Sequence, residues 1–123
     1  MKNIDIVVLN RIVNEIPDFD GGKKENFTNQ VREQIYERDN YICQLCKEYG
    51  KVAHHINPNG DGSIDNGITL CKSCHDMVHY IIRKVKGYPY FNPDIYKAEG
   101  MIADYFNVMF SDISWIKKKL NNV

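Results

Sequence analysis

The feature that most constrains this chain is its pair of Cys-x-x-Cys motifs, which contain all four of its cysteines: Cys43 with Cys46, and Cys71 with Cys74. A Cys-x-x-Cys turn points both sulfurs to the same side, so two such turns can complete a closed tetrahedral site for zinc. We therefore predict one structural Zn²⁺ bound by four thiolates. Two other interpretations are weaker: four unrelated buried cysteines, and a redox centre, which needs only one such motif.

Length and composition indicate a single compact domain of 123 residues. The chain is 43% hydrophobic and 26% charged, which is typical of soluble globular proteins. It has no apolar run long enough to span a membrane, and Met1–Asp5 lacks the apolar character of a signal peptide. We expect a cytoplasmic protein of a bacterium or a phage-infected cell, without a membrane partner. Its 16 basic and 16 acidic residues balance, so contacts to nucleic acid would need local basic clusters.

The spacing of apolar residues predicts an α+β fold that is mostly helical. Residues 3–16 place Ile4, Val8, Ile12 and Ile16 at a helical interval, although their β-branched side chains also allow a strand. The other expected elements are a helix at 28–38 capped by Thr28, extended pieces within 41–53 and at 68–70, a loop at 57–67, a helix at 71–85, and helices beyond residue 92.

All four histidines lie inside or just after the cysteine framework, at His54, His55, His75 and His79. Adjacent residues on a strand point to opposite faces, so His54 and His55 should address different parts of the molecule. His75 and His79 stand four apart on the predicted helix and should share one face. We therefore expect His54 and His75 to meet at a second metal ion. For His79 alone, an ordinary surface or core role is equally acceptable.

Several segments read together resemble the HNH endonucleases of the four-cysteine type, including small phage and bacterial members. These segments are Arg38–Cys46, His54–Ile56, Asn66–His75 and His79. The resemblance covers about residues 28–86 and implies a ββα-metal, treble-clef-like core, with helical flanks at 1–27 and 87–123. One departure is Gly67, where the family commonly has leucine, and we expect it to loosen the packing under the loop.

The resemblance also implies roles for individual residues in DNA phosphodiester hydrolysis. His54 and His75 match metal ligands, and His79 matches a further ligand or a phosphate contact. His55 matches the general base, and Asn66 matches the residue that organises the loop. The catalytic cation would be Mg²⁺, Mn²⁺, Ni²⁺ or Zn²⁺, and imidazole ligands favour Mn²⁺ or Ni²⁺ over Mg²⁺.

Two further questions stay open at the level of sequence. Arg83, Lys84 and Lys86, or Lys117–Lys119, could contact DNA phosphates, but a solvated helix face is an equal alternative. The main alternative function is a non-catalytic zinc module that binds nucleic acid or protein, for example within a phage packaging complex. The set His54, His55, Asn66 and His75 favours the nuclease, because a binding module needs neither a base nor a second metal site. Oligomeric state and nicking versus double-strand cleavage are open.

Overall fold

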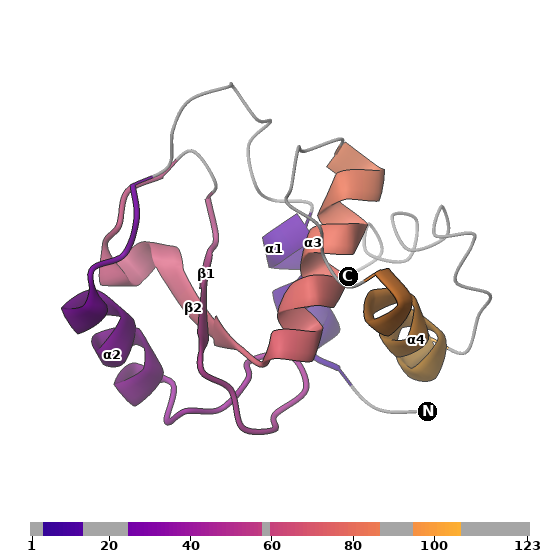
Figure 1. Ribbon diagram of the computed structural model, residues 1–123, viewed down its shortest axis with the longest axis horizontal. Coiled ribbons are helices and arrows are strands. Elements are labelled where there is room, and N and C mark those ends of the chain that lie inside the picture. The colour runs from indigo at the N-terminus through magenta and orange to yellow at the C-terminus, as the bar shows by residue number, and fades with distance from the viewer. Residues whose placement is uncertain (1–3, 14–24, 58–59, 87–94, 107–123) are drawn as a thin grey trace.

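The computed structural model describes residues 4–13, 25–57, 60–86 and 95–106 (Figure 1). The elements in chain order are α1 (Ile6–Val13), α2 (Asn29–Arg38), β1 (Val52–His55), the short 3-10 helix η1 (Ile64–Asn66), β2 (Gly67–Leu70), α3 (Lys72–Lys86) and α4 (Ile95–Phe106). This arrangement confirms the predicted α+β, mostly helical fold. Within these ranges, no helix combines the length and apolar character that crossing a membrane requires.

The sheet consists of β1 and β2, which run antiparallel with Val52 opposite Leu70 and His55 opposite Gly67. Figure 1 shows α2 and this sheet on one side of the molecule, with α1, α3 and α4 on the other. Before the sheet, a single bridge between Ile42 and Tyr49 closes the first cysteine turn. The extended structure predicted within 41–53 therefore consists of this residue pair and the first two residues of β1.

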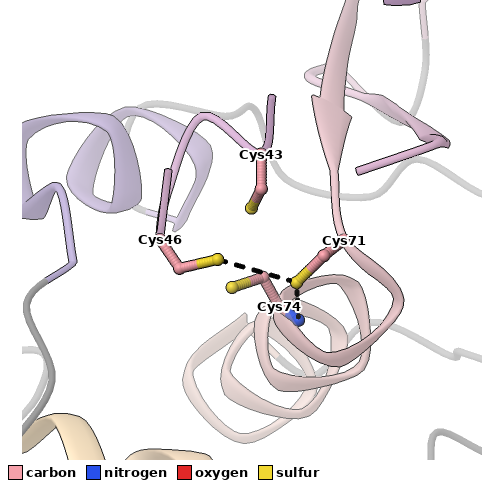
Figure 2. Close-up of side chains that lie close together, drawn as sticks. All are labelled: Cys43, Cys46, Cys71 and Cys74. Carbon is pink, nitrogen blue, oxygen red and sulfur yellow. Dashed lines mark hydrogen bonds between the residues drawn. The ribbon is translucent and has the colours of Figure 1, made fainter. Parts of the chain in front are cut away.

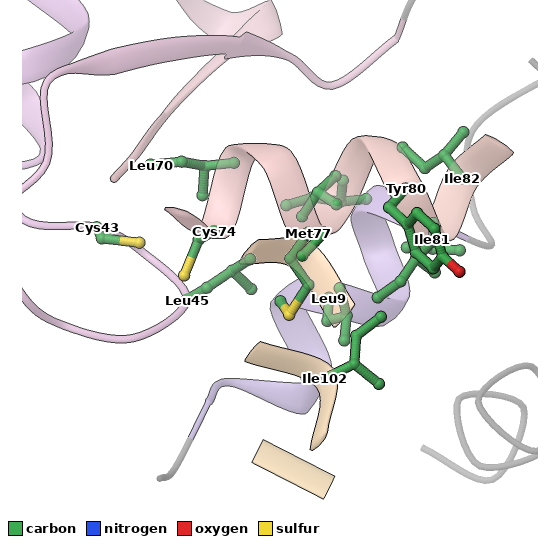
Figure 3. Packing of buried hydrophobic residues seen from close by; sticks show 14 of the residues in the cluster. Leu9, Cys43, Leu45, Leu70, Cys74, Met77, Tyr80, Ile81, Ile82 and Ile102 are labelled. Carbon is green, nitrogen blue, oxygen red and sulfur yellow. The ribbon is translucent and has the colours of Figure 1, made fainter. Parts of the chain in front are cut away.

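The helix α3 supplies the centre of the hydrophobic core (Figure 3). Its fully or almost fully buried side chains include Met77, Val78, Ile81 and Ile82, which recur at helical spacing along one face. Helices α1 and α4 both pack against α3. The two flanking helices therefore complete the core around α3.

The buried face of α1 differs in part from the expected one. Leu9, Ile12 and Val13 are buried, whereas Ile4 and Val8 are only partly buried against the same cluster. The segment is a helix, so the strand alternative is wrong. The helix begins just after Asp5, whose carboxylate accepts a hydrogen bond from the Val8 N–H at 3.0 Å and so caps an otherwise unbonded donor. The predicted position Ile16 lies outside the described residues.

Two charged side chains at the end of α2 cover the outer edge of β2. Arg38 donates to the carbonyl oxygens of Ile64 at 3.0 Å and Gly67 at 2.7 Å, and Asp39 accepts from the Thr69 N–H at 3.0 Å. Arg38 and Asp39 also pair with each other at 2.8 Å. Burial raises the pKa of Asp39, but the hydrogen bonds from Arg38 and Thr69 outweigh it and lower the pKa below its usual value. These side chains form hydrogen bonds with backbone groups of β2 that a third strand would otherwise bind, and so fix the position of β2.

Gly67 does not loosen the packing, and the expectation that it would do so is wrong. A Cβ atom at this position would lie 2.9 Å from Cγ1 of Ile35 and 3.2 Å from Cζ of Phe27. The space that a side chain would need is therefore filled by these two buried residues.

The variant Gly67→Ala is expected to lower the free energy of unfolding by about 1–3 kcal/mol, because it overpacks the core beside Ile35. The matched control is Gly100→Ala in α4, where an added Cβ meets nothing within 4 Å. Alanine there should stabilise the helix by about 0.5–1 kcal/mol. Denaturant unfolding of both variants measures the two changes, and a shift of the same sign in both would contradict this account of Gly67.

Candidate functional site

The four cysteine sulfurs converge between the first cysteine turn and the start of α3 (Figure 2). Cys43 and Cys46 come from the turn, Cys71 directly follows β2, and Cys74 lies in the first turn of α3. All four sulfurs lie within 4.8 Å of one another. The antiparallel sheet thus brings together two motifs that are far apart in the sequence, and the cysteines are positioned as a zinc site, as predicted.

The electrostatics of this cluster also fit a bound cation. Hydrogen bonds from Cys71 and Cys74 lower the pKa of the Cys43 thiol. The hydrogen bond with Cys43, together with its charge, raises the pKa of Cys71 to about 11. Without a bound cation, the negative charge on one thiolate therefore makes the next thiol harder to deprotonate. A divalent ion removes that conflict, because it stabilises every coordinating thiolate at once.

A second cluster is formed by His54 of β1 with His75 and His79 of α3. One nitrogen from each ring lies within 4.8 Å of the others, and the Nε2 atoms of His75 and His79 are 2.8 Å apart. The His54 ring centroid lies 5.6 Å from that of His75 and 5.2 Å from that of His79. His54 is only 4% exposed. The structure therefore brings His54 and His75 together, with His79 placed as the further ligand that the resemblance implies.

These three imidazoles fit a transition-metal ion. Two nitrogens bound to one ion at about 2.1 Å lie about 3 Å apart, which is close to the observed separation of the His75 and His79 nitrogens. Neutral imidazole is a ligand for Zn²⁺, Ni²⁺ and similar ions, whereas Mg²⁺ prefers oxygen ligands. A site with three histidines also leaves coordination positions for a substrate. The donor set thus suits a reactive metal site.

His55 points to the other face of β1, as the strand geometry predicts. Its Nε2 atom lies 2.7 Å from the carbonyl oxygen of Glu25, and its ring stacks on Phe27 with centroids 3.9 Å apart and planes 15° apart. A carbonyl oxygen can only accept, so Nε2 must carry the hydrogen in this bond. In the neutral ring the lone pair then lies on Nδ1. The ring is thus held in one tautomer and one plane.

Asn66 joins the two ends of the loop between β1 and β2. Its side-chain amide donates to the carbonyl oxygens of Asn57 at 3.2 Å and Asp61 at 2.9 Å, while Oδ1 accepts from the Asn57 N–H at 2.9 Å. Its own carbonyl accepts from the Ile56 N–H at 2.9 Å, directly after His55. This geometry suits the expected role of organising the loop.

Among the tentative DNA contacts, Arg83 is exposed on α3. The side chains of Lys84 and Lys86, and all of Lys117–Lys119, lie outside the described residues. The sequence interpretation also missed Glu25 and Phe27, because it placed the start of the core at residue 28. The one local signal was an aromatic residue directly before a helix cap.

Comparisons with known proteins agree with this geometry. Residues 43–81 match the family model of the HNH endonucleases, so the match contains both cysteine pairs and all four histidines. A protein named Anaredoxin from Nostoc sp. strain PCC 7120 is 34% identical over 55 residues, which cover 41% of this chain and 72% of that protein. The chain belongs to the HNH endonuclease family. No solved structure matches this HNH protein significantly. Its HNH segment comprises β1, β2 and most of α3, and the helices α1, α2 and α4 lie outside the match.

Proposed function

We propose that this HNH protein is a metal-dependent endonuclease that hydrolyses phosphodiester bonds in DNA. The observation that carries the proposal is that two adjacent histidines of β1 lie on opposite faces of the strand, in surroundings that suit different chemical roles. His54 joins two imidazoles of α3 on one face, while His55 is held in a single tautomer on the other. A module that only binds zinc and a partner has no use for either arrangement. Phosphodiester hydrolysis needs both, because a metal ion supplies the electrophile and a base activates the attacking water molecule.

His54, His75 and His79 would hold a divalent cation, with Mn²⁺, Ni²⁺ or Zn²⁺ preferred over Mg²⁺. When bound, the cation would polarise a phosphoryl oxygen and stabilise the departing oxygen. Because imidazole is neutral, these three ligands leave both positive charges of the ion uncompensated. The site would therefore attract an anionic group such as a phosphate of the DNA backbone.

His55 would act as the general base. Neutral imidazole titrates near neutral pH and can take a proton from a water molecule. The lone pair on Nδ1 accepts that proton, because Nε2 donates to the Glu25 carbonyl oxygen. As the ring becomes positively charged, this hydrogen bond becomes stronger and stabilises the imidazolium form of His55. Asn66 would keep the neighbouring loop in the shape that this geometry requires.

The test is cleavage of supercoiled plasmid by the purified protein with Mg²⁺, Mn²⁺, Ni²⁺ or Zn²⁺, beside the variant His75→Ala. The wild type should nick or linearise the plasmid and bind one more divalent ion than the variant in calorimetry. The variant should lose cleavage but keep the zinc and the thermal stability, because the backbone N–H that His75 donates to Cys71 is retained.

Absence of cleavage by the wild type with every ion would overturn the proposal. The protein would then be a zinc module that binds nucleic acid or protein, for example in a phage packaging complex. Equal cleavage by His75→Ala would show that the nicking does not come from this site.

A further inference from the structure

A short segment upstream of the HNH match contacts the proposed base directly. This segment, Glu25–Phe27, is called the N-terminal arm below. It precedes the matched residues 43–81 and lies about one helix away from them in the sequence. Nevertheless, the Glu25 carbonyl oxygen lies 2.7 Å from Nε2 of His55, and the Phe27 ring stacks on the His55 ring. Phe27 is only 5% exposed, so this contact is part of the folded interior.

The arm is also bound to the loop that Asn66 organises. The Glu25 N–H donates to the carbonyl oxygen of Gly60 at 3.4 Å, and its carboxylate accepts from the Gly62 N–H at 3.2 Å. A Cβ atom on Gly62 would lie only 2.6 Å from the carbonyl oxygen of Asn26, so the two backbones meet at a distance that only glycine allows.

The Asn66 side-chain amide donates a hydrogen bond to the Asp61 carbonyl oxygen of the same loop at 2.9 Å. A continuous set of contacts therefore runs from Asn66 through the loop and the arm to His55. This set links the asparagine and the base of the HNH motif through residues that the motif does not contain.

We propose that the N-terminal arm is a positioning element for the catalytic base, with Phe27 as its positioning residue. The proposal rests on the proposed function of His55. The Glu25 carbonyl selects the nitrogen that carries the hydrogen, and the Phe27 ring holds the imidazole in the plane that makes this bond possible. The terminal torsion of a histidine is otherwise broad and roughly two-fold, so an unsupported ring can turn about the Cβ–Cγ bond, which puts carbon atoms in the places of Nδ1 and Nε2. Such a turn would break the hydrogen bond from Nε2 to the Glu25 carbonyl oxygen, move the lone pair of Nδ1 away from the water molecule, and leave both tautomers populated.

The experiment compares Phe27→Leu and Phe27→Met with wild type, using steady-state cleavage and nitrogen NMR of the histidine rings. Methionine keeps an apolar side chain of similar length without the flat ring, so it maintains the packing if leucine does not. Both variants should lower kcat by about 10- to 100-fold with little change in KM for DNA, because a misplaced catalytic group affects the chemical step. The NMR signals of His55 should change from one tautomer in the wild type to a mixture.

The matched control is Ile35→Val, which removes a buried methyl group beside the same glycine that Phe27 contacts. It should keep the wild-type kcat and the wild-type His55 tautomer at a similar loss of thermal stability. The inference is overturned if the Phe27 variants also keep the wild-type kcat and the wild-type His55 tautomer. If the wild type does not cleave DNA at all, the proposed function fails, while the NMR signals of His55 still report whether the arm selects its tautomer.

Discussion

Replacing Cys43 with serine is expected to remove the zinc and unfold the protein, and not only to reduce its activity. Cys43 is fully buried and supplies one of the four sulfurs of the cluster. Zinc binding to four-ligand sites contributes about 10–16 kcal/mol in small zinc-dependent peptides. The whole stability of a small domain is only about 5–15 kcal/mol. Loss of the zinc ion therefore removes a contribution as large as the whole stability of the domain, which the rest of the core cannot offset.

Zinc content by mass spectrometry and thermal unfolding by circular dichroism measure this effect. The matched control is Gln44→Ala in the same turn, because only an exposed side-chain hydrogen bond to the Ile42 carbonyl oxygen is lost there. The backbone bond from Gln44 to Thr69 is retained in this variant. The control should keep one zinc ion and a cooperative transition. A Cys43→Ser protein with full zinc content and an unchanged midpoint would show that the cluster does not support the fold.

The second large effect is expected for His55→Ala, which should lower kcat for plasmid cleavage by about 100- to 10,000-fold, the usual contribution of a general base. The side chain is half-buried and contacts the arm, but it lies on the face of β1 opposite the three-histidine cluster. Zinc content, binding of the second metal and DNA affinity should therefore persist. Single-turnover cleavage at saturating protein separates the chemical step from DNA binding.

The control for this substitution is Lys51→Ala, directly before β1. Lys51 is exposed and its ammonium group lies 3.8 Å from the Glu33 carboxylate, an exposed pair that contributes little to stability. Its cleavage rate should match that of the wild type. A His55→Ala protein that cleaves as fast as this control would indicate another base or a contaminating nuclease.

Features that depend on short stretches of chain could be predicted from the sequence. Thr28 caps α2 through a 3.1 Å bond from the Val31 N–H, as its residue type suggests. The buried face of α3 follows from apolar residues at helical spacing. The side-by-side placement of His75 and His79 follows from the helical repeat, and the opposite orientations of His54 and His55 follow from the strand.

Contacts between distant segments could not be read in this way. The burial of Leu9 and Val13 on α1 depends on where α3 lies, which the spacing of the α1 residues does not encode. The close packing at Gly67 depends on Ile35 of α2, more than thirty residues earlier. From the sequence alone, glycine at this position suggests loose packing, but in the structure Ile35 fills the space that a side chain would occupy.

The sequence by itself determined which groups carry the chemistry: four thiolates in two turns, four imidazoles, and the secondary structure that orients each of them. These properties are local, since backbone geometry sets the direction of a side chain within a few residues. Only the tertiary structure decided that His79 joins His54 and His75, and that Glu25 and Phe27 hold His55. Such contacts arise from the packing of distant segments against one core, and no local pattern specifies which residues meet there.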